Sequence, residues 1–116
     1  MSSSSLLLLP LALLAGAARV PAPTACPGVS NGAQLTDGAV YDGPVEDNAI
    51  LEPDGARMIG GAEISSWRVD GIYRHGRQVF LTCDYAHQPR IVVRVSRPVR
   101  SCRYSDGKLK QSLACR

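Results

Sequence analysis

Apolar residues alternate with other residues over two short stretches in the second half of the chain. Between residues 79 and 85, and again between 91 and 95, each odd-numbered residue is apolar or aromatic. A period of two is typical of β-strands, whose successive side chains point to opposite faces of a sheet. The intervening residues 86–90 contain Pro89, which interrupts strands, so we expect a hairpin with its loop at this point.

Residues 64–69 predict a further strand. Ile64 and Trp67 are out of phase for a simple alternation, which indicates a β-bulge within this strand. Signs of helix are few: only residues 45–51 could form a helical turn, which Pro53 would end.

Turn-forming dipeptides divide the rest of the chain at short intervals. Such pairs tolerate the positive φ angles of tight hairpin turns. Eight occur: Asn31-Gly32, Asp37-Gly38, Asp42-Gly43, Asp54-Gly55, Gly60-Gly61, Asp70-Gly71, His75-Gly76 and Asp106-Gly107. The last two strands are expected to lie before and after the final dipeptide, Asp106-Gly107. The pattern therefore predicts a mainly β fold, a small antiparallel sheet, meander or open barrel with at most one short helix.

The N-terminal segment has the layout of a secretory signal peptide. Residues 6–14 are apolar and uncharged, and the small residues 15–18 offer a cleavage site. The apolar run is shorter than the ~20 residues of a membrane-spanning helix, and Pro10 interrupts it. The alternative interpretation is an ordinary apolar helix at the N-terminus of the folded domain.

Removal of a signal peptide at residues 1–18 leaves 98 of the 116 residues, which is enough for one domain. We divide them into an extended, proline-rich arm at 19–27 and a single disulfide-bonded β domain at 28–116. This domain is expected in the periplasm or secreted, and not as an integral membrane protein. A lipid anchor on Cys26 is not expected, because Pro23 stands where a lipobox has an aliphatic residue.

All four cysteines lie beyond the predicted signal peptide, and an even number in a small exported chain indicates disulfides. Four cysteines allow three pairings, and the sequence alone does not choose among them; we favour Cys26 with Cys83 and Cys102 with Cys115. In the chain-entropy account these bonds would contribute about 4 and 3 kcal/mol respectively. The alternative is a zinc site that includes His87, but no C-x-x-C pair is present. We expect no metal and no other cofactor.

Acidic and basic residues are concentrated in different halves of the chain. Residues 37–70 hold eight acids and two arginines, a net charge of −6, whereas residues 74–116 hold ten bases and two acids, a net charge of +8. The two halves could neutralise each other in a mixed surface, or present oppositely charged faces that steer a charged partner. Nucleic acid is not the expected partner, because the whole chain carries only +3 and few aromatic residues.

The sequence contains no pattern typical of an active site. His75 and His87 fall in predicted turns, and the adjacent carboxylates Glu46 and Asp47 would diverge on a strand or a helical turn rather than face one gap. Nucleophile-elbow, zinc-protease, phosphate-loop and calcium-loop motifs do not occur. We therefore expect a protein that is not an enzyme.

A set of motifs resembles the signature of a family of small exported proteins from Gram-negative proteobacteria. The motifs span residues 26–116: Cys26-Pro27, Tyr41-Asp42-Gly43-Pro44, Glu46, Leu51-Glu52-Pro53-Asp54, Trp67, Leu81-Thr82-Cys83-Asp84-Tyr85, Cys102 and Cys115-Arg116. Two features depart from the family pattern. Val45 stands where a second proline is usual, and the segments after Cys26 and Cys102 are shorter, so a hairpin that joins Cys102 to Cys115 must be tight.

The resemblance implies a periplasmic location and a binding role. Members of the family can occur near genes for type VI secretion effectors, including effectors that act on peptidoglycan. The resemblance therefore implies an immunity protein, one that blocks a toxin arriving in the periplasm. A small disulfide-bonded β domain is also similar in architecture to periplasmic lysozyme inhibitors.

We predict a non-catalytic periplasmic protein that binds or inhibits a protein partner. The contact residues are expected in the acidic loop, residues 42–54, with the tryptophan as anchor: Asp42, Glu46, Asp47, Glu52 and Trp67. The loop residues could instead only fix turns, and Trp67 could fill the core over a disulfide. The alternative function is a structural or stress-related envelope protein that associates with peptidoglycan or lipid head groups through its basic C-terminal half.

Overall fold

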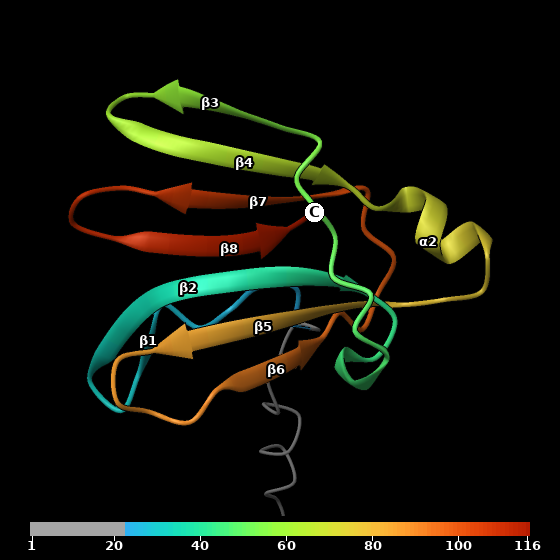
Figure 1. Ribbon diagram of the computed structural model, residues 1–116, viewed down its shortest axis with the longest axis horizontal. Coiled ribbons are helices and arrows are strands. Elements are labelled where there is room, and N and C mark those ends of the chain that lie inside the picture. Colours follow the sequence, from blue (N-terminus) through green and yellow to red (C-terminus); the bar gives the residue numbers. More distant parts are fainter. Residues whose placement is uncertain (1–22) are drawn as a thin grey trace, which may run out of the picture.

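The computed structural model describes residues 23–116, which form two four-stranded antiparallel sheets around a shared core (Figure 1). The first sheet has the strand order β1 (Val29–Ser30), β2 (Ala33–Asp42), β5 (Val79–Tyr85) and β6 (Ile91–Arg94). The second sheet has the order β3 (Gly55–Ile59), β4 (Ala62–Arg68), β7 (Ser101–Asp106) and β8 (Gln111–Cys115). The two sheets meet where β2 lies beside β8 (Figure 1). The predicted mainly β, antiparallel fold is confirmed.

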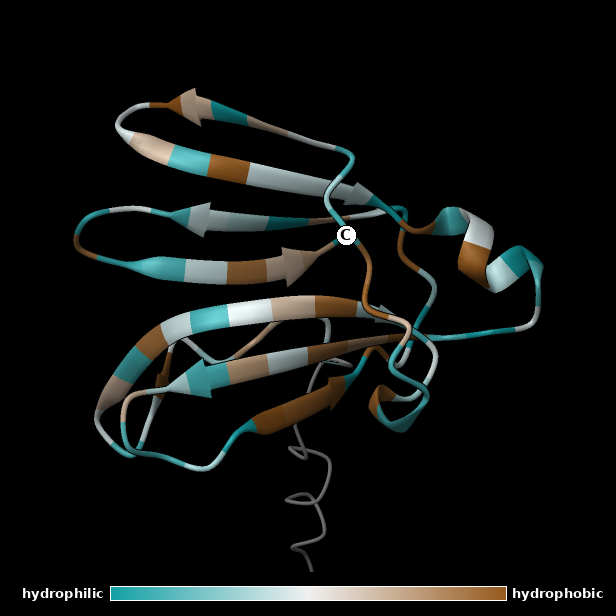
Figure 2. Cartoon of the chain, in the orientation of Figure 1, coloured by the Kyte–Doolittle hydropathy of each residue, from teal (hydrophilic) through white to brown (hydrophobic). Residues whose placement is uncertain are grey.

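The hairpin predicted from the alternation between residues 79 and 95 is formed by β5 and β6. Its register runs from Phe80 opposite Arg94 to Cys83 opposite Ile91. β5 lies between β2 and β6, and its odd-numbered side chains are buried in the core: Val79, Leu81, Cys83 and Tyr85. Figure 2 shows the hydrophobic residues that run along most of β6.

The expected bulge lies in another strand. β4 pairs with β3 and with β7 without a shift of register, so the prediction of a bulge at residues 64–69 was wrong. Ile64 and Trp67 are out of phase because they occupy opposite faces of a regular strand; Trp67 enters the core, and Ile64 lies on the outer face. The irregularity occurs in β2, between Leu35 and Asp37.

Two of the predicted turns adopt a backbone that few other residue pairs accept. The φ angles are 48° and 83° at Asn31-Gly32, between β1 and β2, and 56° and 82° at Gly60-Gly61, between β3 and β4. Positive φ at both positions is typical of the type I′ turn, whose twist suits a hairpin. Other dipeptides of the set are not turns: Asp37-Gly38 lies inside β2, and Asp70-Gly71 begins a helix.

Two short helical segments interrupt the strands. The 3₁₀ turn η1 (Val45–Asp47) lies within the segment where a helical turn was expected. The α-helix α2 (Asp70–Arg74) was not expected. It buries Ile72, and its Arg74 Nη1 lies 3.3 Å from Asp70 Oδ2, an i,i+4 ion pair. Because α2 has five residues and buries only one of them, its sequence shows no helical period of 3.6 by which it could be recognised.

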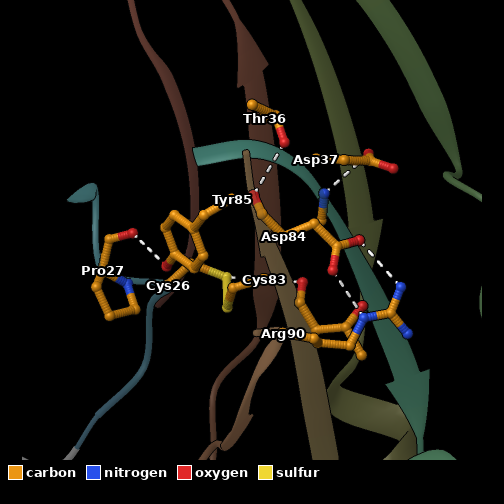
Figure 3. The surroundings of a disulfide bond; sticks show 10 residues. Cys26, Pro27, Thr36, Asp37, Cys83, Asp84, Tyr85 and Arg90 are labelled. Carbon is orange, nitrogen blue, oxygen red and sulfur yellow. Dashed lines mark hydrogen bonds and ion pairs between the residues drawn. A yellow bond between two sulfur atoms is a disulfide. The ribbon is translucent and has the colours of Figure 1, made fainter. Parts of the chain in front are cut away.

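The structure confirms the pairing of cysteines that we favoured: Cys26–Cys83 and Cys102–Cys115. The first bond ties the segment before β1 to the middle of β5 (Figure 3). Beside it, the hydroxyl of Tyr85 donates a hydrogen bond of 2.6 Å to the carbonyl oxygen of Pro27 (Figure 3). The second bond joins directly opposite residues of β7 and β8.

The segment before β1 is extended and covers the edge of β8. The amide of Cys26 donates to the carbonyl oxygen of Leu113 at 2.9 Å, and the amide of Cys115 donates to that of Thr24 at 2.8 Å. The predicted signal peptide, residues 1–18, lies outside the described residues, as does the beginning of the predicted arm. The domain boundaries therefore stay predictions.

Candidate partner-binding surface

The acidic loop folds back on the end of β2. The amide of Leu51 donates to the carbonyl oxygen of Val40 at 2.9 Å, and the amide of Asp42 donates to that of Ala49 at 3.0 Å. Asn48, directly after η1, takes a φ of 57° as the chain reverses. Because asparagine tolerates this left-handed conformation, the loop returns to the sheet without a glycine.

Asp42 holds the first end of the acidic loop and does not present a free charge. Arg77 Nε donates to Asp42 Oδ1 at 2.6 Å, and Arg77 Nη2 donates to the backbone oxygen of Asp42 at 2.9 Å. The hydrogen bond to Asp42 is the main reason why the pKa of Arg77 is raised. Gly43 has a φ of 90°, and a Cβ at this position would lie 2.6 Å from Arg77 Nη2. The backbone therefore requires glycine here, and a side chain at this position would displace the end of Arg77.

Trp67 holds the other end of the acidic loop. It is 6% exposed, and its indole N–H donates to the carbonyl oxygen of Leu51 at 3.1 Å. Asp54, at the end of the loop, accepts a hydrogen bond from the amide of Arg68. Trp67 also lies directly opposite Cys102 on the neighbouring strand, the position of a core residue over a disulfide. Little of its surface is left for a partner.

Three of the predicted contact residues remain available at the surface. Glu46 and Asp47 project from η1, and Glu52 follows on the return to β3. All three are exposed, and none forms an ion pair or a side-chain hydrogen bond with the part of the chain that the structure describes. The five predicted residues thus divide into two that position the loop and three that it exposes.

Only part of the charge separation along the sequence is neutralised within the fold. Four ion pairs occur between residues 23 and 116: Arg68–Asp70, Arg74–Asp70, Arg77–Asp42 and Arg90–Asp84. Pairs as exposed as these contribute about 0–1 kcal/mol each to stability. Because most of the bases in the second half have no acidic partner among the described residues, the fold leaves them on its surface.

A basic face on the second sheet was missed by the sequence analysis. Ile64 of β4 and alternate residues of β7 and β8 line a shallow hollow of about 280 Å³, in which Arg103 and Arg116 lie among the short side chains of Ser101, Ser105, Ser112 and Ala114. The serines are short and polar, so no hydrophobic alternation marks these strands as one surface. The spacing of Ser101, Arg103 and Ser105, every second residue of β7, is the one signal that could have indicated it.

The described residues offer little for metal chemistry. Between residues 23 and 116 no three His, Cys, Asp or Glu side chains gather as they would around a metal ion. His75 Nδ1 lies 2.8 Å from the carbonyl oxygen of Gly71 in α2, and His87 lies in the β5–β6 loop with a φ of 57°. Within the same range, no helix has the length and hydropathy needed to cross a membrane.

Fold and surface together define a small, disulfide-bonded β domain with an exposed acidic loop on one part and a basic sheet face on another. The family model of the type VI secretion system Tli immunity protein matches residues 30–116, and the chain belongs to this family. The suspected association with type VI effector immunity is thereby confirmed. No curated protein and no solved structure matches the chain.

Proposed function

We propose that the mature domain is a periplasmic immunity protein that binds a type VI effector and blocks it by occupying its surface, without catalysis. The membership in the Tli immunity family carries this proposal, since an immunity protein has an effector as its partner. The periplasm is supported by the signal-peptide pattern at residues 1–18 and by the two disulfides, which form and persist in oxidising compartments.

The acidic loop is the first contact that we propose. Glu46, Asp47 and Glu52 are exposed on a loop whose two ends are held by Asp42 and Trp67. A loop that is ordered before it binds loses little conformational entropy on association, which favours tight binding. Three free carboxylates on such a loop would complement a basic or polar cleft and would speed the encounter with it.

A capture experiment tests the proposed function. Oxidised residues 19–116 are used as bait for the secreted and periplasmic proteins of the organism, with reduced and alkylated protein as control. One stoichiometric effector that only the oxidised form retains is the expected result. Salt-sensitive sedimentation with purified peptidoglycan, and no effector captured, would instead favour the envelope-associated role of the basic half.

The acidic loop is tested with the captured effector. We expect Glu46→Lys together with Asp47→Lys to weaken binding by about tenfold or more, because the change replaces two attractive charges with two repulsive ones. The matched control is Asp37→Lys with Asp84→Lys, the same change of charge at paired positions of β2 and β5, at the end of the first sheet away from the acidic loop. Equal affinity of the two double variants would remove the basis for the loop contact.

The target of the effector is the finer part of the proposal. We propose an effector that attacks the cell wall, as the resemblance implied. The purified effector is incubated with peptidoglycan and, separately, with phospholipid vesicles, each with and without the immunity protein. Release of peptidoglycan fragments that the immunity protein suppresses is expected. Attack on the vesicles alone would refute the cell-wall target and leave the immunity role intact.

A further inference from the structure

β3 is an open edge of the second sheet. Its one strand partner is β4, and no other described segment forms backbone hydrogen bonds with it. All five of its residues are exposed. At the opposite edge, β8 is covered by residues 24–26. Natural sheets usually blunt a bare edge because its free N–H and C=O groups pair with any suitable strand. An edge left bare suggests that something binds there.

The face beside this edge is basic. Arg57 of β3 lies opposite Ile64, and Ile64 lies opposite Ser105, so the three residues are on one face of the sheet. A second hollow, of about 240 Å³, adjoins the first across Ile64 and is lined by Arg57, Gly55 and Ser66. Arg57, Arg103 and Arg116 line the two hollows, which contain no acidic residue. None of the three arginines forms an ion pair within residues 23–116.

Exposed apolar side chains gather at the turn end of this sheet. Met58 and Ile59 of β3 are 66% and 45% exposed, and Leu109, in the β7–β8 turn, is 89% exposed. The two turns are neighbours, because a Cβ on Gly107 would lie 3.8 Å from Cβ of Ala62. Figure 2 shows hydrophobic residues at both turns of this sheet, between hydrophilic ones. Large exposed apolar residues beside an open edge are typical of a binding surface.

The first sheet has an open edge of a different kind. Arg90 directly precedes the edge strand β6, and Arg94 is its last residue. The side chains of both are already bonded, Arg90 to Asp84 at 2.7 Å and Arg94 to Gln78 at 2.6 Å. Among the strands described here, β3 is thus the bare edge whose neighbouring face gathers several arginines, Arg57, Arg103 and Arg116, that form neither an ion pair nor a side-chain hydrogen bond with residues 23–116.

We propose that β3 and the basic face beside it bind an extended, acidic segment of the effector, which adds to the second sheet as a further strand. This inference rests on the proposed function and adds a second contact to the acidic loop. Backbone hydrogen bonds to β3 would supply affinity, and the arginines would select an acidic sequence. A second copy of this chain fits poorly, since antiparallel pairing of β3 with itself about Arg57 would bring like charges together.

Strand addition has a direct signature in amide hydrogen exchange. The type I′ turn makes Ile59 and Ala62 a hydrogen-bonded pair, so alternation along the strand directs the N–H groups of Ala56 and Met58 toward the free edge. We expect exchange of residues 55–59 to slow by about tenfold or more when the effector binds. Unchanged exchange of this segment in a saturated complex would overturn the proposal.

Charge reversal tests the basic face. Arg57→Glu with Arg103→Glu is expected to weaken binding of the effector by about tenfold or more and to reduce its dependence on salt. The control is Arg94→Glu with Arg97→Glu, which makes the same change of charge outside the second sheet and is expected to alter the affinity by less than about twofold. Circular dichroism and thermal unfolding establish that each variant is folded, and Arg57→Gln with Arg103→Gln replaces the first pair if it is not.

The outcomes separate this inference from the proposed function. If wild-type protein captures an effector and the Arg57/Arg103 variant binds it equally well, strand addition fails and immunity stands. If wild-type protein captures no effector, the proposed function itself fails. Slow amide exchange of β3 in the free protein, together with a dimer in light scattering, would identify a second copy of the chain as the occupant. Binding to anionic vesicles that requires the same arginines would identify lipid as the occupant. Either result would overturn the proposal.

Discussion

Gly38 lies in the middle of β2, where this strand meets the second sheet, and its replacement by alanine tests how the two sheets pack. A Cβ on Gly38 would lie 2.8 Å from Leu113 Cδ2 and 3.1 Å from the backbone oxygen of Thr82. Leu113 is fully buried in β8, and Thr82 belongs to the buried centre of β5. Neither neighbour can move away without disturbing the core.

Two opposing effects set the size of the change. Overpacking of a filled core costs about 1–3 kcal/mol, whereas the loss of glycine's freedom in the unfolded chain returns about 0.4–1 kcal/mol. We therefore expect Gly38→Ala to lower the free energy of unfolding by about 1–2 kcal/mol. In a domain of this size, that loss lowers Tm by roughly 5–15 °C. Urea unfolding followed by the fluorescence of Trp67 measures it.

Gly55 supplies the matched control, because it also lies in a strand but a Cβ there would meet no described atom within 4 Å. Gly55→Ala should be neutral or stabilising by up to about 1 kcal/mol. In the double variant Gly38→Ala/Leu113→Ala, the new methyl group occupies part of the space that the leucine leaves, so the double loss should be smaller than the sum of the single losses by about 1 kcal/mol. Equal stability of Gly38→Ala and Gly55→Ala, or strict additivity with Leu113→Ala, would refute the close contact between the sheets.

Two further predictions concern the disulfides and the partly buried phenol of Tyr104. Replacing Cys26 and Cys83 by alanine should lower the free energy of unfolding by about 4 kcal/mol, and replacing Cys102 and Cys115 by about 3 kcal/mol. The first loss is larger because the first bond closes the longer loop. Equal losses of the two variants in urea unfolding would argue against this account. Burial is the main cause that raises the pKa of Tyr104 to about 12. Since the unfolded chain ionises this phenol near pH 10, stability should fall as the pH rises from about 10 to 12. Absorbance titration at alkaline pH should show a late phase that Tyr104→Phe removes.

The parts of the fold that could be predicted from the sequence are those that local pattern determines. The alternation in β5 and the positive-φ pairs at Asn31-Gly32 and Gly60-Gly61 each act within a few residues, so the hairpins were predictable. Gly38 and α2 were not, because their conformations depend on distant partners. Asp37-Gly38 has the composition of a turn, yet the approach of Leu113, 75 positions later in the chain, requires the glycine within a strand.

The candidate site shows the same division. The acids of the loop could be named from the sequence. The sequence does not show that Asp42 is bonded to Arg77, 35 residues away, or that the N–H of Trp67 donates to the carbonyl oxygen of Leu51. The basic face was not predictable at all, since Ile64 meets the residues of β7 and β8 only through strand pairing across some forty residues. Polar side chains carry no periodic signal of which face they will share.

The two proposed contacts together explain how a small immunity protein can be selective. An acidic loop alone would attract any basic surface, and a basic sheet face alone would attract any acidic one. The return of the acidic loop leads directly into β3, so the loop and the edge strand of the second contact form one continuous segment, residues 42–59, beside which Arg103 and Arg116 complete the basic face. The Asp42–Arg77 pair holds the beginning of this segment, and pairing with β4 holds its end. A partner must then offer charge of both signs in one arrangement, and a partner with one sign only meets repulsion at the other contact. If both proposed contacts form, discrimination between related effectors would depend on the spacing between them, which the ends of the loop, held by Asp42 and Trp67, maintain.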